Sequence, residues 1–356
     1  MKLRHLSLSR LAIKIASTLK QNILLIGAAI LLSGLGILGL QAYRFLASHN
    51  VTPVDLLGFF GSPVQPLDST DGVTNILLLG IRGEGSDSPN LSDTIIVFSF
   101  NHDTKKAAIL SVPRDLWVPS IKAKINTAYY YGEEATVGGG IKFAQGAILE
   151  DLGLPIHYTA VVNFSLFKQA VDLAGGVDVD VNPGFTDTEF PIPGRENALP
   201  IASRYETITF PLGLNHLDGD TSLKFVRSRH SVGEEGTDFA RSKRQQQVIS
   251  SLRQKFLTPS FLLDRSKVTQ LMDIVSKNLK TNISENLYPT LAKLALDSKN
   301  NTIKNIALTN TPDDQGISIL FNPPVAKYNN EWVLIPKDNN WNTLKQYIKN
   351  KLQTVQ

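Results

Sequence analysis

The sequence predicts an α/β protein: a three-layer α-β-α sandwich with a mixed central sheet, preceded by one N-terminal transmembrane helix. Two patterns lead to this prediction. Short apolar runs of strand length alternate with segments of helical periodicity, as in proteins whose helices cover a largely internal sheet. In addition, one long apolar run without charges lies near the N-terminus.

The N-terminal apolar run, residues 21–43, has the length of a membrane-spanning helix. It carries no charge and would extend for roughly 35 Å as a helix, enough to cross a bilayer core. Basic residues precede it and only Arg44 follows closely, so the N-terminus is expected in the cytoplasm. The run is longer than a signal-peptide core, which favours an uncleaved anchor over the alternative of a cleaved signal sequence. We therefore expect single-pass insertion in the cell membrane, with residues 45–356 outside the cytoplasm.

This topology divides the chain into four parts. Residues 1–20 form a basic cytoplasmic tail, and residues 21–43 form the transmembrane anchor. Residues 44–72, which are rich in proline and glycine, form an extracytoplasmic linker. Residues 73–356 form the α/β domain, because the helical segments and the single apolar run of the C-terminal part complete the same pattern.

The elements of the domain follow from periodicity. Buried strands are predicted over residues 75–81, 94–100, 107–113, 158–164, 177–181 and 332–336. Helices are predicted over residues 138–154, 165–176, 217–229, 238–256, 268–279 and 286–296, with one more at the C-terminus.

Composition excludes several classes of site. The chain has no cysteine, which removes disulfides, zinc–thiolate sites and cysteine nucleophiles. It contains no HExxH motif, no nucleophile elbow and no phosphate-binding loop with its lysine. The formal net charge is +4, but the first 20 residues alone contribute five positive charges, so the remainder is close to neutral. We therefore expect no nucleic-acid partner.

An unusual cluster of cations lies between residues 224 and 247. Its four arginines are Arg227, Arg229, Arg241 and Arg244. If residues 238–256 are helical, Asp238, Arg241 and Gln245 fall on one face of the helix. Arginine is costly to bury unless an anion meets it, and its planar fork binds phosphate groups in a bidentate manner. The cluster favours a pyrophosphate-like ligand over a merely solvated helix surface.

Three other residues complete a candidate site. Arg114 follows an apolar strand, at a sheet edge where α/β folds place ligands. Asp93 begins another strand and Asp87 lies in the loop before it; paired carboxylates in this setting suit Mg²⁺ or Mn²⁺, although turn residues are the alternative.

Taken together, these segments resemble the LytR-CpsA-Psr family of bacterial envelope proteins. The resemblance extends in order from about residue 75 to 257, through NILLLGIR, LSDTIIVFSFN, KKAAILSVPRDLWV, KINTAYYYG, HYTAVVNFSLFKQAVDLAGGVDVDV, LDGDTSLKFVRSRH and DFARSKRQQQVI. It implies a membrane-anchored, Mg²⁺-dependent phosphotransferase. Such an enzyme moves a glycopolymer from a polyprenyl-pyrophosphate carrier in the bilayer to a peptidoglycan hydroxyl.

The resemblance also suggests roles for individual residues. Catalytic roles are expected for Asp93, Arg114, Arg227, Arg229 and Arg241. Substrate contacts are expected from Arg82, Lys124, Arg244, Gln245 and Asp238. The metal ligands are expected to be Asp93 and Asp87.

Two departures from the family pattern affect the metal site. Arg82 stands where the family often has an aspartate, and Leu91 where it often has an arginine. We expect Asp87 and Arg82 to replace the lost carboxylate and the lost arginine.

The sequence leaves open the general base, the site of the prenyl chain and the choice among three functions. The base that activates the acceptor hydroxyl is expected to be Asp93 or Asp115. The prenyl chain is expected between the sheet and the helix of residues 141–152. A polyprenyl-pyrophosphate hydrolase and a non-catalytic envelope-binding protein are the alternative functions.

Overall fold

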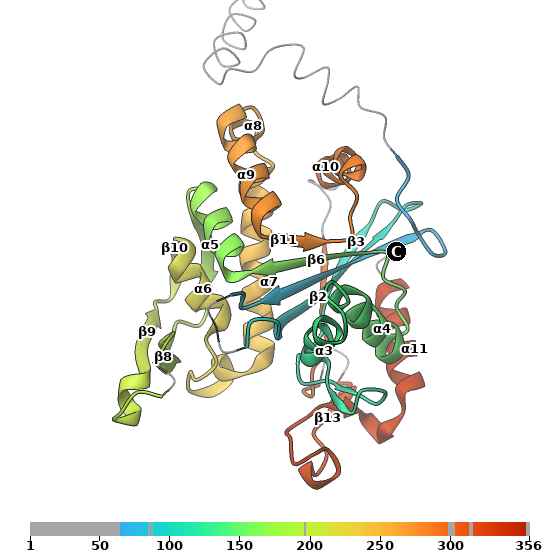
Figure 1. Cartoon of the computed structure of the whole chain (residues 1–356). Helices are drawn as coiled ribbons and strands as arrows, with labels where there is room; N and C mark the ends of the chain where they lie inside the picture. The colour runs from blue at the N-terminus through green and yellow to red at the C-terminus, as the bar shows by residue number, and fades with distance from the viewer. Residues whose placement is uncertain are drawn as a thin grey trace, which may run out of the picture. The chain divides into compact units, whose positions relative to one another are not determined.

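A six-stranded mixed sheet forms the centre of the fold (Figure 1). The computed structural model describes residues 65–84, 86, 88–195, 197–297, 303–312 and 316–353. The strands of the sheet, in spatial order, are β11 (Leu279–Thr281), β6 (Tyr158–Asn163), β1 (Val73–Ile81), β2 (Ser92–Asn101), β3 (Ala107–Ser111) and β12 (Lys304–Ala307). β1 is parallel to β6 and antiparallel to β2, and β3 is antiparallel to β2. The two edge strands differ, because β12 is parallel to β3 whereas β11 is antiparallel to β6.

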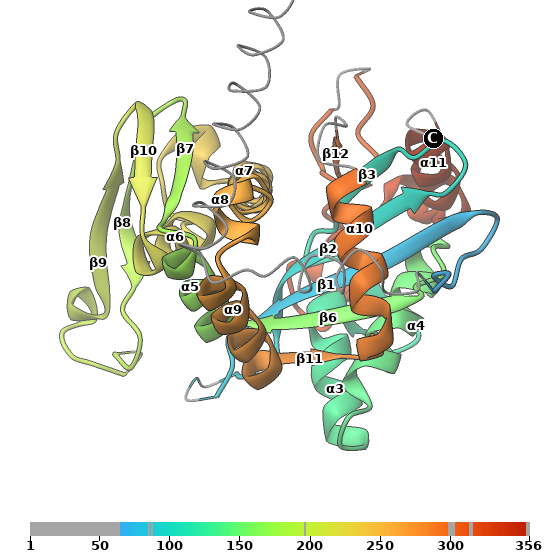
Figure 2. The same ribbon diagram turned by 90° about the horizontal axis from the view of Figure 1, so that it is seen from above.

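Helices cover both faces of this sheet (Figures 1 and 2). On one face lie α3 (Ala128–Ala135), α4 (Gly140–Leu152) and α11 (Trp341–Gln353). There Leu77 and Val97 share a buried core with Ile148 and Leu344. On the other face lie α7 (Asp238–Phe256) and α10 (Tyr288–Asp297). Alternate residues of a strand point to opposite faces, so β1 contributes to both layers. The predicted mixed sheet with helices on either side is confirmed.

A second, smaller core lies beside the sheet; its helices and one of its strands were predicted from the sequence, and its other three strands were not. It is built from α5 (Phe164–Leu173), β7 (Val177–Val181), β8 (Phe185–Pro191), β9 (Tyr205–Phe210), β10 (Gly213–Leu217), α6 (Gly219–Arg227) and one side of α7. β7 pairs with β10 and β8 with β9, each as an antiparallel ribbon. Of these strands only β7 was predicted, because its VDVDV sequence alternates regularly, whereas β8, β9 and β10 lack a regular alternation of apolar and polar residues.

Three consecutive glutamines, Gln245 to Gln247, connect α7 to both cores through hydrogen bonds of their side chains. The side-chain amide of Gln245 donates to Thr94 Oγ1 on β2 (2.9 Å), and that of Gln246 donates to Ser111 Oγ on β3 (2.9 Å). The amide of Gln247 donates instead to the carbonyl of Asp180 on β7 (3.0 Å). Successive side chains of a helix are about 100° apart, so three neighbours can reach partners in different directions.

The remaining elements are short or lie near the periphery. They are β4 (Trp117–Val118), β5 (Ala123–Lys124), α8 (Pro259–Leu262), α9 (Arg265–Asn278), β13 (Leu320–Phe321) and β14 (Ile335–Pro336). In the described part of the chain no helix has both the length and the apolar character needed to cross a bilayer. The predicted anchor, residues 21–43, lies outside the described residues.

We expect Gln246→Ala to lower the free energy of unfolding by about 1–2 kcal/mol, because Ser111 would lose the amide that bonds it in a buried place. Urea denaturation measures this change. Gln247→Ala, which removes a more exposed hydrogen bond, serves as the matched control and should cost less. Equal decreases in the free energy of unfolding of Gln246→Ala and Gln247→Ala would contradict the idea that the buried hydrogen bond contributes more than the exposed one.

Candidate functional site

Four polar side chains meet at one edge of the central sheet. β1, β3 and β6 end at this edge and the antiparallel β2 begins there. The strand directions therefore bring together Arg82 after β1, Asp93 at the start of β2, Arg114 after β3 and Asn163 at the end of β6. This is the position at which open α/β sheets place their ligands.

A close contact between β1 and β2 docks α7 against the same edge. A Cβ atom at Gly80 would lie 2.8 Å from Cβ of Thr94, so only glycine fits at that point of β1. Thr94 in turn accepts the hydrogen bond from Gln245. The start of α7, which carries Arg241, is thereby held over the ends of the strands.

Asp93 is bonded by two arginines at once. Arg114 Nη1 donates to Asp93 Oδ1 (2.7 Å), and Arg82 Nε donates to Asp93 Oδ2 (3.1 Å). Burial by itself raises the pKa of Asp93, but the charges of Arg114 and Arg82 and their hydrogen bonds outweigh it and hold the pKa below its ordinary value. Asp93 is therefore a carboxylate at neutral pH and a weak proton acceptor.

Arg114 is supported from behind by a second carboxylate. Asp115 is 3% exposed and lies 3.4 Å from Arg114 Nε and 3.1 Å from Lys124 Nζ. Lys124 was expected to contact the substrate. It does not line the pocket described below; through Asp115 it supports Arg114, because a buried carboxylate needs cationic partners.

Around these groups lies a pocket with a cavity volume of about 190 Å³. Its lining includes five arginines: Arg82, Arg114, Arg227, Arg229 and Arg241. Most of the other lining is apolar and comes from β1, α5, β6, β8, α6 and α7: Leu78, Val162, Phe164, Phe167, Phe190, Pro191, Leu223, Val226 and Ile249. Cations and apolar surface thus share one cavity.

Arg227 shows how a guanidinium can be accommodated beside apolar side chains. Its Cζ lies 4.7 Å from the centre of the Phe164 ring and 5.4 Å from that of Phe190. The ring faces attract the cation and fix its plane. Burial lowers the pKa of Arg227. The negative charge of Asp93 raises this pKa, and the positive charge of Arg82 lowers it. The guanidinium nevertheless stays protonated.

Arg244 differs from the expectation that it binds substrate. It does not line the pocket and is only 2% exposed. Its guanidinium donates to the carbonyls of Phe225 (3.0 Å) and Ser228 (2.7 Å) and to the Glu235 carboxylate (2.8 Å). Because these bonds use the planar fork, Arg244 fixes the segment that connects α6 to α7.

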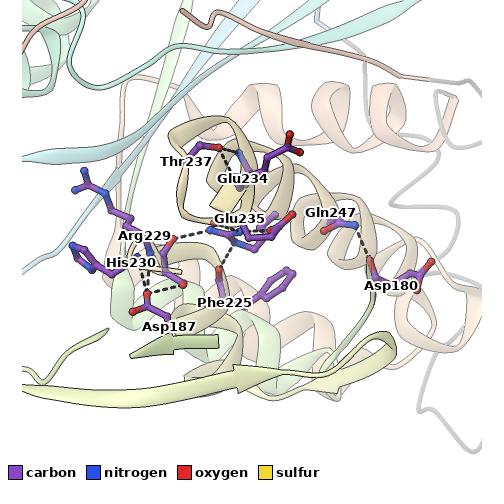
Figure 3. Close-up of polar contacts among 12 residues, drawn as sticks. Asp180, Asp187, Phe225, Arg229, His230, Glu234, Glu235, Thr237 and Gln247 are labelled. Carbon is purple, nitrogen blue, oxygen red and sulfur yellow. Dashed lines mark hydrogen bonds and ion pairs between the residues drawn. The ribbon is translucent and has the colours of Figure 1, made fainter. Parts of the chain in front are cut away.

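Asp187, on β8, holds the same segment from the other side and was not singled out by the sequence analysis. One carboxylate oxygen accepts from Ser228 Oγ (2.7 Å) and from the backbone N–H groups of Arg229 (3.0 Å) and His230 (3.1 Å), as Figure 3 shows for the last two. Burial alone raises the pKa of Asp187, but these bonds and one from the Glu189 N–H outweigh it and hold the pKa below its ordinary value. No local pattern pointed to this residue, because the apolar face of β8 is interrupted by Asp187 itself.

The structure brings most of the predicted site residues together. Asp93, Arg114, Arg227, Arg229, Arg241, Arg82 and Gln245 line the same pocket. Asp87 and the side chain of Asp238 lie outside the described residues. The slot expected for the prenyl chain beside residues 141–152 is corrected: no residue of this helix lines the pocket, because α4 packs its apolar face into the core beneath the sheet.

The described residues do not by themselves fit a magnesium site. Magnesium requires oxygen ligands in a near-octahedral arrangement, and each oxygen of Asp93 already accepts a hydrogen bond from an arginine. Over the described ranges, no three His, Asp or Glu side chains are grouped so that they could hold a metal ion. The second expected ligand, Asp87, lies outside those ranges.

The fold and the pocket define an α/β protein with an arginine-lined site at a sheet edge, suited to an anionic ligand that carries an apolar group. The chain belongs to the LytR_cpsA_psr family, whose sequence model matches residues 53–346. It is 29% identical over 262 residues to the polyisoprenyl-teichoic acid–peptidoglycan teichoic acid transferase TagU of Bacillus cereus, which covers 71% of this chain and 75% of that relative.

Two further comparisons agree with this assignment. The TagU protein of Oceanobacillus iheyensis, with the same full name, is 31% identical over 242 residues, covering 67% of this chain and 68% of the relative. The crystal structure of TagV from B. subtilis has the same fold, with a TM-score of 0.54 and 24% identity over 80% of this chain and 99% of that one.

We expect Asp187→Asn to lower the free energy of unfolding at pH 7 by about 2–3 kcal/mol, because the amide cannot accept all four hydrogen bonds of the carboxylate. The folded-state pKa lies below the unfolded one. The stabilisation is therefore present above about pH 4 and is lost as the pH falls through the folded-state pKa. Chemical denaturation at pH 7, 5 and 3 should show the wild type and the variant converging at low pH.

The exposed Asp220→Asn serves as the control and should change stability little at each pH. A difference between the wild type and Asp187→Asn that stayed constant from pH 7 to 3 would contradict the stabilising role of the ionised carboxylate.

Proposed function

We propose that this chain is a membrane-anchored phosphotransferase. In the reaction it would move a glycopolymer from a polyprenyl-pyrophosphate carrier to a sugar hydroxyl of peptidoglycan. The observation that carries the proposal is the pocket itself, in which five arginines and a run of apolar side chains surround a single cavity. A pyrophosphate joined to an isoprenoid chain has the same two parts, an anion and a hydrocarbon.

The arginines would bind the two phosphates and stabilise the charge that develops as the bridging bond breaks. Phosphoryl transfer demands little covalent chemistry from a protein beyond alignment and charge stabilisation. Arg114 and Arg82 are oriented by Asp93, and Arg227 is oriented by two phenylalanine rings. These groups are fixed before a ligand arrives, which lowers the cost of organising the transition state.

The apolar lining would hold the start of the prenyl chain. The cavity, about 190 Å³, is smaller than the usual site for a whole drug-sized ligand. It therefore suits the pyrophosphate and the first isoprenoid units, while the rest of the lipid stays in the bilayer. The anchor predicted at residues 21–43 would keep the domain beside that bilayer, on the outer side of the cell membrane.

The relatives support the same reaction class. The two TagU proteins are named for the transfer of teichoic acid from a polyisoprenyl carrier to peptidoglycan. The shared fold and family favour an equivalent transfer here, with the identity of the polymer left to experiment.

We expect the purified protein to convert a synthetic polyprenyl-pyrophosphate glycan and peptidoglycan fragments into polyprenyl phosphate and a glycan-phosphate adduct. Arg114→Ala should lower the rate by at least about a hundredfold, because it removes one donor to the transition state. Mass spectrometry of both products measures the reaction. The exposed Arg195→Ala, which does not line the pocket, is the control.

The alternatives give different products. Release of polyprenyl phosphate without an adduct would identify a hydrolase. Tight binding of the lipid without turnover would identify a non-catalytic binding protein.

Dependence on Mg²⁺ or Mn²⁺ stays a prediction from the sequence, with Asp87 and Asp93 as its proposed ligands. We expect activity to be lost in EDTA, to return with either metal, and to require a higher metal concentration in Asp87→Ala. Titration of the metal against the transfer rate measures this. Full metal-dependent activity in Asp87→Ala would remove Asp87 from the site, and full activity in EDTA would remove the metal.

A further inference from the structure

The proposed transfer, on which this inference rests, needs a group that takes the proton from the attacking hydroxyl. The sequence suggested Asp93 or Asp115, and neither fits this role. Asp93 is bonded by two arginines, which hold its pKa low and make it a weak base. Asp115 is buried between Arg114 and Lys124 and does not line the pocket.

Apart from Asp93, one side chain in the described lining of the pocket is of a type that serves as a proton acceptor, the imidazole of His230. The five arginines stay protonated, and the amides and the hydroxyl of the lining are not bases. A neutral imidazole accepts a proton efficiently at the pH of the cell exterior, which is why histidine is the most frequent general base.

His230 is also held in a defined position. Its backbone N–H donates to Asp187 Oδ2, the oxygen that also binds the N–H of Arg229. In Figure 3 the side chains of Arg229 and His230 extend to the same side of this segment, and both line the pocket. One buried carboxylate thus fixes the stretch of backbone from which the side chains of Arg229 and His230 extend.

The exposure of His230 suits a group that meets the acceptor. Its side chain is exposed, whereas Arg241, which also lines the cavity, is only 6% exposed. A large peptidoglycan acceptor must approach from solvent, so the base has to be reachable at the rim while the lipid fills the apolar part of the cavity.

We propose that His230 is the general base of the transfer. Its neutral imidazole accepts the proton of the acceptor hydroxyl as that oxygen bonds to the phosphorus that carries the glycopolymer. The bond from this phosphorus to the bridging oxygen breaks, and polyprenyl monophosphate leaves with the electron pair. The imidazolium then passes its proton to water, and the enzyme is ready for another cycle.

The test compares His230→Ala with the wild type in the transfer assay. We expect kcat to fall by about 10²–10³-fold, with the affinity for the lipid substrate changed less than threefold, because the arginines are intact. Added imidazole should raise the transfer rate of His230→Ala at least tenfold, which would not happen if His230 had a purely structural role. The control is His216→Ala, another exposed histidine, which is bonded to Asp178 outside the pocket.

Several outcomes would overturn the proposal. One is a kcat for His230→Ala within threefold of the wild type, and another is a loss that imidazole does not rescue. Rescue of Asp87→Ala or Asp238→Ala by acetate, with His230→Ala active, would assign the base to a carboxylate. In each of these cases, transfer activity in the wild type would still support the proposed function. If the wild type itself showed no transfer, both the proposed function and this inference would be rejected.

Discussion

The repulsion among like charges is the constraint on which this structure depends. Five arginines line one cavity, and Asp93 is the one carboxylate among its described lining residues. Charges of one sign at short distance in a partly buried place oppose folding unless other groups offset them. Among the described contacts, Asp93 bonds two guanidinium groups directly, Asp115 supports Arg114 from behind, and aromatic rings face Arg227. An anionic ligand would offset the repulsion further, so the same repulsion becomes a source of affinity.

The site also depends on where two cores meet. α7 presents Gln245 and Gln246 to the central sheet and Gln247 to β7, so one helix belongs to both. The segment before α7 carries Arg229 and His230, and its backbone is hydrogen-bonded to the Arg244 guanidinium and to the Asp187 carboxylate. Arg244 and Asp187 therefore shape the pocket without contacting a ligand, because they fix the backbone of this segment.

Local pattern predicted the central elements and most of the site, and its failures have physical causes. β1, β2, β3 and β6 each contain a run of apolar residues because helices cover both faces of their sheet, and such runs are easy to recognise. β8 has polar residues on both of its faces, with Asp187 at a buried position, so neither the ribbon nor Asp187 could be foreseen. Arg244 lies three residues from Arg241 on the same helix and looks equivalent in sequence. Only the tertiary contacts separate a guanidinium that binds carbonyls from one that lines the cavity.

The edge strands of the sheet have a consequence for how the chain matures. Among the described residues, all those that line the pocket lie at or before Ile249, whereas β11 and β12, which pair with β6 and β3 at the two edges, come later. A chain made from its N-terminus therefore completes these pocket residues before either edge of the sheet can pair. Unpaired strand edges readily associate with other chains, so this interval carries a risk of aggregation. The last part of the described chain thus covers both edges of the sheet while it contributes no side chain to the pocket.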